Sequence, residues 1–226
     1  MTLPKTILWC DCETTGLDPQ SDKLLEIATI SADFQTPFDL HPDVNETFKA
    51  VFSLRDWSMV PQKVIEMHKE SGLLAECVAL PPVHSTSLPE LTLADRELCR
   101  RYMPKFNPAY LQRAKEEEEY RVPDEDKLVL AGSTVHFDLA FIRSHLPAFV
   151  ECLSHRVYDV SAIKLFCYSL GMPEIPKCQP AHRAGDDILS SIEHARRCVA
   201  WLEGLDRRAT QKDVAFLSEA ARRSIA

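Results

Sequence analysis

The first third of the chain alternates apolar and polar residues in the manner of β-strands. Residues 6–13 and 24–34 are rich in aliphatic and β-branched residues, and residues 48–54 repeat apolar side chains at every second position. Successive side chains of a strand point to opposite faces, so this alternation places one face against a core. We predict three strands in this part of the chain.

The second half of the chain mixes short apolar runs with helical patterns. Runs at 128–134 and 156–161 predict two further strands. Helices are expected over 61–69, 137–149, 162–170 and 185–202, the last with Ile188, Ile192, Ala195, Val199 and Leu202 in one stripe. Strands followed by alternating strands and helices predict an α/β fold, in which helices flank a mixed sheet.

Residues 75–126 interrupt this pattern. The segment starts rich in proline and serine, which is typical of irregular chain, and residues 91–103 then have the composition of a helix. A charged run at 114–127 favours a solvated helix or a linker over a binding site. We therefore interpret residues 1–202 as a single domain with an insert at about 75–126, and residues 203–226 as a helical C-terminal extension.

Composition narrows the class of protein. The 226 residues carry a net charge of −8, and 45% of them are hydrophobic, enough for a full core. The acidic balance excludes a protein that coats long nucleic acid, but it permits a nuclease that needs few phosphate contacts. The eight cysteines lack zinc-type spacing and favour a reducing compartment.

The N-terminus shows neither a signal peptide nor an Arg-rich transit peptide. No apolar run approaches the ~20 residues of a membrane span. We expect a cytoplasmic protein without a membrane partner, and keep the mitochondrion as the alternative.

The acids at the end of the first predicted strand are the strongest chemical signal. Asp11 and Glu13 lie two residues apart, so they share a strand face with Ile7 and Trp9. Two carboxylates at the mouth of a buried strand repel each other and are costly without compensation. Either a hard divalent metal ion lies between them, or the strand simply ends in a solvated acidic turn.

Three later residues favour the metal. Asp138 follows the fourth predicted strand, His182 precedes the last helix, and Asp187 lies in the first turn of that helix. In this order the five residues resemble the DEDDh family of 3′-to-5′ exonucleases. The segments ETTGLDP, SDKLLEIATISADF, EMHKESGL and HRVYDVSAIK are similar to oligoribonucleases within that family. The resemblance covers about residues 6–73 and 127–202.

The resemblance implies a ribonuclease H-like fold with a mixed five-stranded sheet. It implies two Mg²⁺ or Mn²⁺ ions held by Asp11, Glu13, Asp138 and Asp187 that assist hydrolysis of short RNA to 5′-mononucleotides. His182 would be the general base, since its ordinary pKa suits proton transfer near neutrality; the alternative is a surface histidine.

The resemblance also implies residues that hold the substrate: Thr14, Leu17, His68, Thr134, Arg156 and Ser161. For Leu17 the alternative is a turn leucine packed on the core. For Arg156 it is an ion-pair partner on the surface. The partners implied are short single-stranded RNA and a second copy of the chain in a homodimer.

Two departures from the family concern base stacking. Lys63 stands where oligoribonucleases have a tryptophan, and His155 where they have a tyrosine donated across the dimer interface. Losing such platforms weakens a strict dinucleotide preference. Another DEDDh exonuclease for longer RNA or DNA is therefore an alternative. A non-catalytic nucleic-acid-binding module is a second alternative, which the filled catalytic positions and the acidic charge disfavour.

Overall fold

The computed structural model describes the chain except residues 1–3, 39–46, 81–89, 104–121, 177–180 and 209–226. Its sheet consists of β1 (Thr6–Thr14), β2 (Leu24–Asp33), β3 (Thr47–Val51), β4 (Leu128–Gly132) and β5 (Leu153–Asp159). The five strands lie in the order β3-β2-β1-β4-β5. The first three pair antiparallel, whereas β1, β4 and β5 are parallel. The predicted mixed five-stranded sheet is confirmed.

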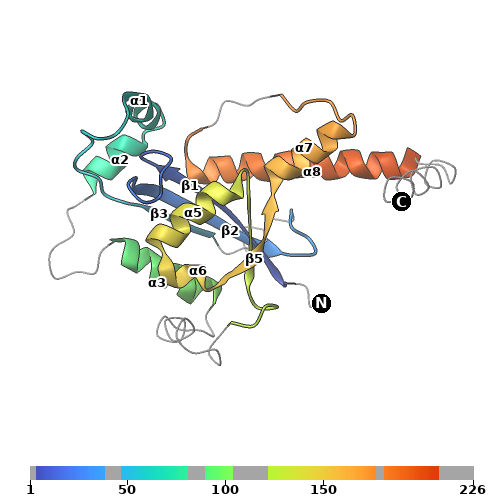
Figure 1. Ribbon diagram of the computed structural model, residues 1–226, viewed down its shortest axis with the longest axis horizontal. Helices are drawn as coiled ribbons and strands as arrows, with labels where there is room; N and C mark the ends of the chain where they lie inside the picture. Colours follow the sequence, from blue (N-terminus) through green and yellow to red (C-terminus); the bar gives the residue numbers. More distant parts are fainter. Residues whose placement is uncertain (1–3, 39–46, 81–89, 104–121, 177–180, 209–226) are drawn as a thin grey trace, which may run out of the picture.

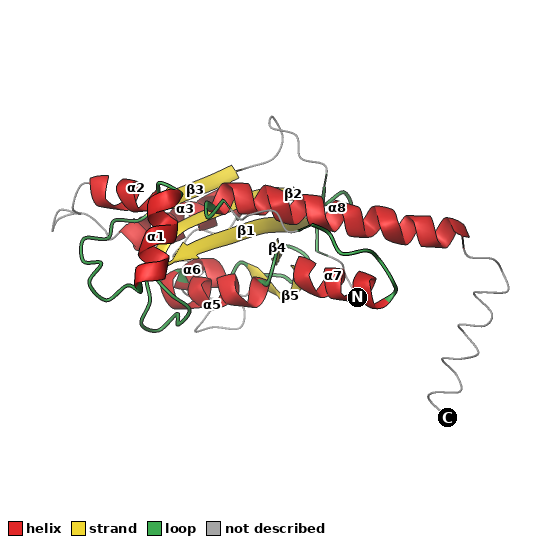
Figure 2. Cartoon of the chain, turned by 90° about the horizontal axis from the view of Figure 1, so that it is seen from above, coloured by secondary structure: helices red, strands yellow, loops and turns green. Residues whose placement is uncertain are grey.

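Helices cover both faces of this sheet. They are α1 (Gln62–Glu70), α2 (Leu73–Ala79), α3 (Glu90–Tyr102), α5 (Val135–His145), α6 (Pro147–Val150), α7 (Val160–Ser169) and α8 (Ala184–Arg208). The sheet lies between α8 on one side and α5 and α6 on the other (Figures 1 and 2). None of the helices in the described ranges is both long and apolar enough to cross a membrane.

Several predicted boundaries were wrong. β3 ends at Val51, and β5 begins at Leu153, three residues earlier than predicted. The helix predicted over 137–149 is split into α5 and α6, because Pro147 lacks an N–H and keeps the preceding residue out of the helical region. Helix α2 extends to Ala79, into chain predicted to be irregular. Residues 114–121, where a solvated helix or a linker was expected, and residues 209–226, where a helical extension was expected, lie outside the described residues.

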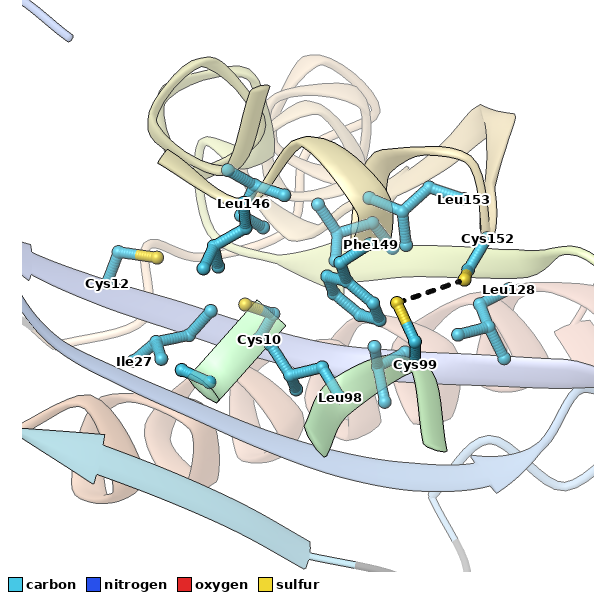
Figure 3. Packing of buried hydrophobic residues seen from close by; sticks show 14 of the residues in the cluster. Cys10, Cys12, Ile27, Leu98, Cys99, Leu128, Leu146, Phe149, Cys152 and Leu153 are labelled. Carbon is cyan, nitrogen blue, oxygen red and sulfur yellow. Dashed lines mark hydrogen bonds between the residues drawn. The ribbon is translucent and has the colours of Figure 1, made fainter. Parts of the chain in front are cut away.

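One face of the sheet packs on α3, α5 and α6. Cys10 and Cys12 point into this core, on the strand face opposite Asp11 and Glu13. Figure 3 shows Cys99 of α3 facing Cys152, with the two sulfur atoms 4.0 Å apart. Because Leu98 and Cys99 are fully buried here, α3 belongs to the domain core although it lies in the predicted insert.

The other face packs on α8. Ile7 and Trp9 of β1 lie in one buried cluster with Ile188, Ile192 and Ala195, which confirms the first part of the predicted stripe of α8; Val199 and Leu202 lie outside this cluster and are half-buried. The same strand face continues past this cluster to Asp11 and Glu13. The packing of α8 against β1 therefore brings the start of the helix to the acidic end of the strand.

Candidate active site

Three carboxylates converge at the end of β1. Asp11 and Glu13 come from the strand and Asp187 from the first turn of α8. Each offers a carboxylate oxygen, and these oxygens lie within 4.8 Å of one another. Carboxylates without thiolates select hard cations such as Mg²⁺ or Mn²⁺, so the donor set fits the predicted metal.

Asp138 lies beside this group, in the first turn of α5. Its side chain is buried, and its Oδ1 accepts a hydrogen bond of 2.9 Å from the Cys12 backbone N–H. It lines the same pocket as the other acids but is outside the compact set of three. The four predicted acids thus share one site, with Asp138 attached to the backbone of β1.

Burial and mutual repulsion raise the pKa values of these acids. Burial, followed by Asp138 and Glu13, raises the pKa of Asp11 to about 9. Burial, followed by Asp187 and Glu26, raises the pKa of Glu13 to about 8. Burial also raises the pKa of Asp138 to about 7. A bound cation would reverse these shifts, because it favours the ionised carboxylates.

His182 reaches the site from the turn that precedes α8. It is a non-glycine residue with a φ of 52°, in the left-handed region, and its side chain lines the pocket with the acids. The neighbouring Ala181 N–H donates a hydrogen bond of 3.3 Å to Asp187 Oδ1. His182 and Asp187 are therefore brought together as their spacing predicted.

The acids open into a pocket of about 480 Å³. It is lined by Asp11, Cys12, Glu13, Leu17, Ser133, Thr134, His136, Phe137, Asp138, Lys164, His182, Asp187, Ser190, Ser191 and His194. Leu17 is 83% exposed at this pocket, so the alternative of a turn leucine packed on the core is wrong. Thr134 is also exposed here, and its hydroxyl lies 3.1 Å from that of Ser161.

Thr14, His68 and Arg156 were also predicted to hold the substrate, and they are not among the residues that line the pocket. Thr14 is buried, and its hydroxyl donates to the Gly16 carbonyl oxygen at 2.6 Å. His68 is fully buried, with Nε2 2.9 Å from the Thr14 carbonyl oxygen and Nδ1 4.0 Å from Glu13 Oε2. Arg156 is half-buried on β5 and is not among the residues that line the pocket. For these three the substrate contact stays a prediction.

The connections after β4 and β5 are tied to each other by Asp159. Its carboxylate caps α7 by accepting from the Ser161 and Ala162 N–H groups, and it also accepts from the N–H groups of Thr134 and Val135. Gly132 ends β4, where an added Cβ would lie 2.7 Å from the Cys10 carbonyl oxygen. Because glycine has no Cβ, β4 can approach β1 closely at this point, beside Asp11.

Sequence reasoning missed a second set of charged residues behind the site. Glu26 of β2 is fully buried and binds Arg183, the residue after His182, while Arg183 also binds Glu76 of α2. A signal was present, since Glu26 interrupts the apolar run LLEIATI. An acid inside a buried strand calls for a charged partner.

Comparisons with known proteins agree with this geometry. The Exonuclease (RNase_T) family model matches residues 8–82. The chain is 32% identical over 195 residues to a probable oligoribonuclease of Schizosaccharomyces pombe, covering 84% of this chain and 66% of that protein. It is 32% identical over 194 residues to the oligoribonuclease of Mycobacterium avium, covering 82% of this chain and 76% of that protein. The chain thus spans just under two thirds of the yeast relative.

A solved structure supports the fold. The zinc-bound complex of E. coli exonuclease I with single-stranded DNA superposes with a TM-score of 0.51 at 17% identity, covering 89% of this chain and 43% of that chain. At this identity the likeness concerns the fold alone.

Proposed function

The chain belongs to the oligoribonuclease family, and we propose that it is a metal-dependent 3′-to-5′ exoribonuclease. Its substrates would be short single-stranded RNA oligonucleotides, and its products 5′-mononucleotides. The observation that carries this proposal is the compact group of Asp11, Glu13 and Asp187 oxygens in a pocket that also contains His182.

Asp11, Glu13 and Asp187 would hold two divalent cations, Mg²⁺ or Mn²⁺, with Asp138 as the fourth acidic ligand. When bound, the cations supply Lewis-acid activation of water and neutralise charge at the scissile phosphate. The protein's contribution is to keep four carboxylates close together against their repulsion. Burial of Glu13 and Asp138 and the hydrogen bond from Cys12 N–H do this by limiting where the acids can move.

His182 would act as the general base. A neutral imidazole nitrogen accepts a proton from the attacking water, whose oxygen forms the new bond to phosphorus. The bond from phosphorus to O3′ breaks and O3′ takes up a proton from solvent, which leaves a 3′-hydroxyl on the shortened RNA and a 5′-phosphate on the released nucleotide. His182 lines the pocket and lies five residues before Asp187 in the chain, and this position supports the role.

The substrate would be short. The acidic surface gives little grip on phosphates outside the pocket. Leu17 is exposed at the pocket and would pack against bases, while Thr134 and Ser161 would contact the phosphate at the far end, with Arg156 adding charge. Lys63 and His155 offer weaker stacking than aromatic residues, so we expect activity on RNA of two to about five nucleotides rather than on dinucleotides alone.

The cellular context is proposed from the family and from composition. We propose a cytoplasmic protein that acts as a homodimer on single-stranded RNA. Size-exclusion chromatography with light scattering tests the dimer, and a mass of one chain at micromolar concentration would contradict it.

The function is tested with 5′-phosphorylated RNA and DNA ladders of two to about twenty nucleotides, at fixed salt, with Mg²⁺, with Mn²⁺ and with EDTA. We expect 5′-mononucleotides from the 3′ end of RNA, kcat/KM that falls with length, and no turnover in EDTA. Equal efficiency at about twenty nucleotides, or a preference for DNA, would favour the general exonuclease. Binding without hydrolysis under every metal condition would favour the non-catalytic module.

A further inference from the structure

Glu26 is a fully buried acid whose partners are all provided by the protein. Its oxygens accept hydrogen bonds from Arg183 Nε at 3.2 Å, from Arg183 Nη2 at 2.9 Å and from the Ala184 backbone N–H at 2.9 Å. Lys49 Nζ of β3 lies 2.9 Å from Glu26 Oε1. Such a carboxylate has its charge balanced and is unsuited to bind a cation or a substrate. Its role is to fix the positions of Arg183 and Ala184, which bind it.

Arg183 is held from two sides. One edge of its guanidinium faces Glu26, and Nη1 and Nη2 donate to Glu76 Oε1 and Oε2 at 2.8 and 2.9 Å. The planar fork of arginine makes such paired bonds directional as well as strong. The side chain thus links β2 to α2, and it is 17% exposed.

The main chain of Arg183 is the start of α8. Its carbonyl oxygen accepts hydrogen bonds from the N–H groups of Asp186 and Asp187, at 3.0 and 3.1 Å. His182, one residue earlier, has the left-handed φ of 52° that costs a non-glycine residue free energy. Such a conformation persists only where the surroundings determine it. The contacts of Arg183 lie directly beside the strained residue.

We propose that Glu26 and Arg183 are positioning residues, whose buried ion pair holds the turn at His182 and thereby places His182 and Asp187 against Asp11 and Glu13. The inference rests on the proposed function for its effect on catalysis. Its structural part, that the pair fixes the turn, is independent of any reaction.

Lys49 supplies a matched control. It contacts the same carboxylate of Glu26 but comes from β3 and is 51% exposed. Lys49→Met removes one positive charge beside Glu26, but it keeps the hydrogen bonds that Arg183 and Ala184 donate to Glu26. If the ion pairs of Glu26 only stabilise the fold, Lys49→Met and Arg183→Lys will act alike. If Arg183 positions the turn, the two variants will differ in readouts at residues 181–187.

The first readout is amide hydrogen exchange of the metal-free protein by NMR, at the Ala181 and Asp187 amides. We expect Glu26→Gln and Arg183→Lys to lower protection at these amides by about tenfold or more, and Lys49→Met by less than about threefold. Equal loss in all three variants, or no loss in Arg183→Lys, would overturn the inference. If Glu26→Gln does not fold, Arg183→Lys decides, since it keeps the charge and loses only the fork.

The second readout is steady-state hydrolysis of a short RNA. We expect kcat to fall roughly 10- to 100-fold in Glu26→Gln and Arg183→Lys, with KM changed by less than about threefold, because a displaced base affects chemistry more than binding. Lys49→Met should keep kcat within about threefold of the parent. Unchanged kcat in Arg183→Lys would overturn the catalytic effect. If the parent protein hydrolyses no RNA, the proposed function fails, and the exchange data alone decide the positioning role.

Discussion

Replacing Asp11 by Asn removes one carboxylate from a place where ionisation is unfavourable. Burial and four neighbouring acids, Asp138, Glu13, Asp187 and Glu26, all raise its pKa, to about 9 from 3.8. The amide keeps the size of the side chain but carries no charge. We therefore expect Asp11→Asn to abolish hydrolysis and yet to make the metal-free protein more stable.

The size of the effect follows from linkage. Since the folded pKa lies above the unfolded one, the contribution of Asp11 to stability is fully present below about pH 4 and is lost as the pH rises toward 9. At pH 7 the gap from 3.8 corresponds to about 4 kcal/mol, at about 1.4 kcal/mol per pH unit. Repulsion is shared among the acids, so the single substitution should stabilise by about 1–3 kcal/mol.

The assay is urea unfolding of the parent and variant from pH 4 to 9, in EDTA and in Mg²⁺ at constant ionic strength. The two proteins should match near pH 4 and diverge as the pH rises. Added Mg²⁺ should stabilise the parent more than the variant. Asp186→Asn, at an exposed acid of the same helix, is the control and should show no such gain. The reasoning is refuted if Asp11→Asn is less stable than the parent in EDTA at pH 8.

Three further variants test the rest of the site. His182→Ala should lower kcat by about 10²–10⁴-fold while the Mg²⁺-dependent rise in Tm persists; an unchanged rate would contradict a general base. Lys63→Trp combined with His155→Tyr should steepen the fall of kcat/KM with RNA length, and an unaltered profile would argue against the stacking interpretation. Gly132→Ala should cost about 1–3 kcal/mol in urea unfolding, because its Cβ would meet the Cys10 carbonyl oxygen; equal stability would show that β4 can shift freely.

Local patterns predicted the part of the site that depends on strand geometry. The alternation of β1 was sufficient to place Asp11 and Glu13 on the face of Trp9, because a strand has only two faces. The first turn of α8 was predictable from its apolar stripe, and with it the position of Asp187. These predictions needed only residues that are near each other in sequence.

Contacts between distant segments were not predictable in the same way. Arg183 and Glu26 are 157 residues apart, and which acid an arginine pairs with depends on how α8 crosses the sheet. The burial of His68 against the Thr14 carbonyl oxygen and Glu13 was likewise not predictable, because it depends on how α1 packs on the end of β1. The start of β5 was missed because Leu153 and Ser154 follow a turn, and pairing with β4 rather than local pattern extends the strand.

Glu13 and Glu26 show how the protein separates a structural acid from a candidate ligand. They are directly opposite in the register of β1 and β2, and both are buried. Burial alone would raise the pKa of Glu26, but hydrogen bonds from Arg183 and Lys49 lower it below its ordinary value. His68 Nδ1 lies 4.0 Å from Glu13 Oε2, and burial lowers the pKa of that histidine, which disfavours the protonated form that an ion pair would need.

Because the two acids share strand geometry and burial, their opposite pKa shifts come from their partners. Arg183 binds Glu26 and Glu76, so its donors are directed away from the group of Asp11, Glu13 and Asp187. The charge of Arg183 lowers the pKa of Glu13, but burial and the neighbouring acids raise it to about 8, so repulsion among the carboxylates of the pocket prevails. A divalent cation bound by these acids would offset that repulsion, which is the electrostatic condition for the hydrolysis proposed at this site.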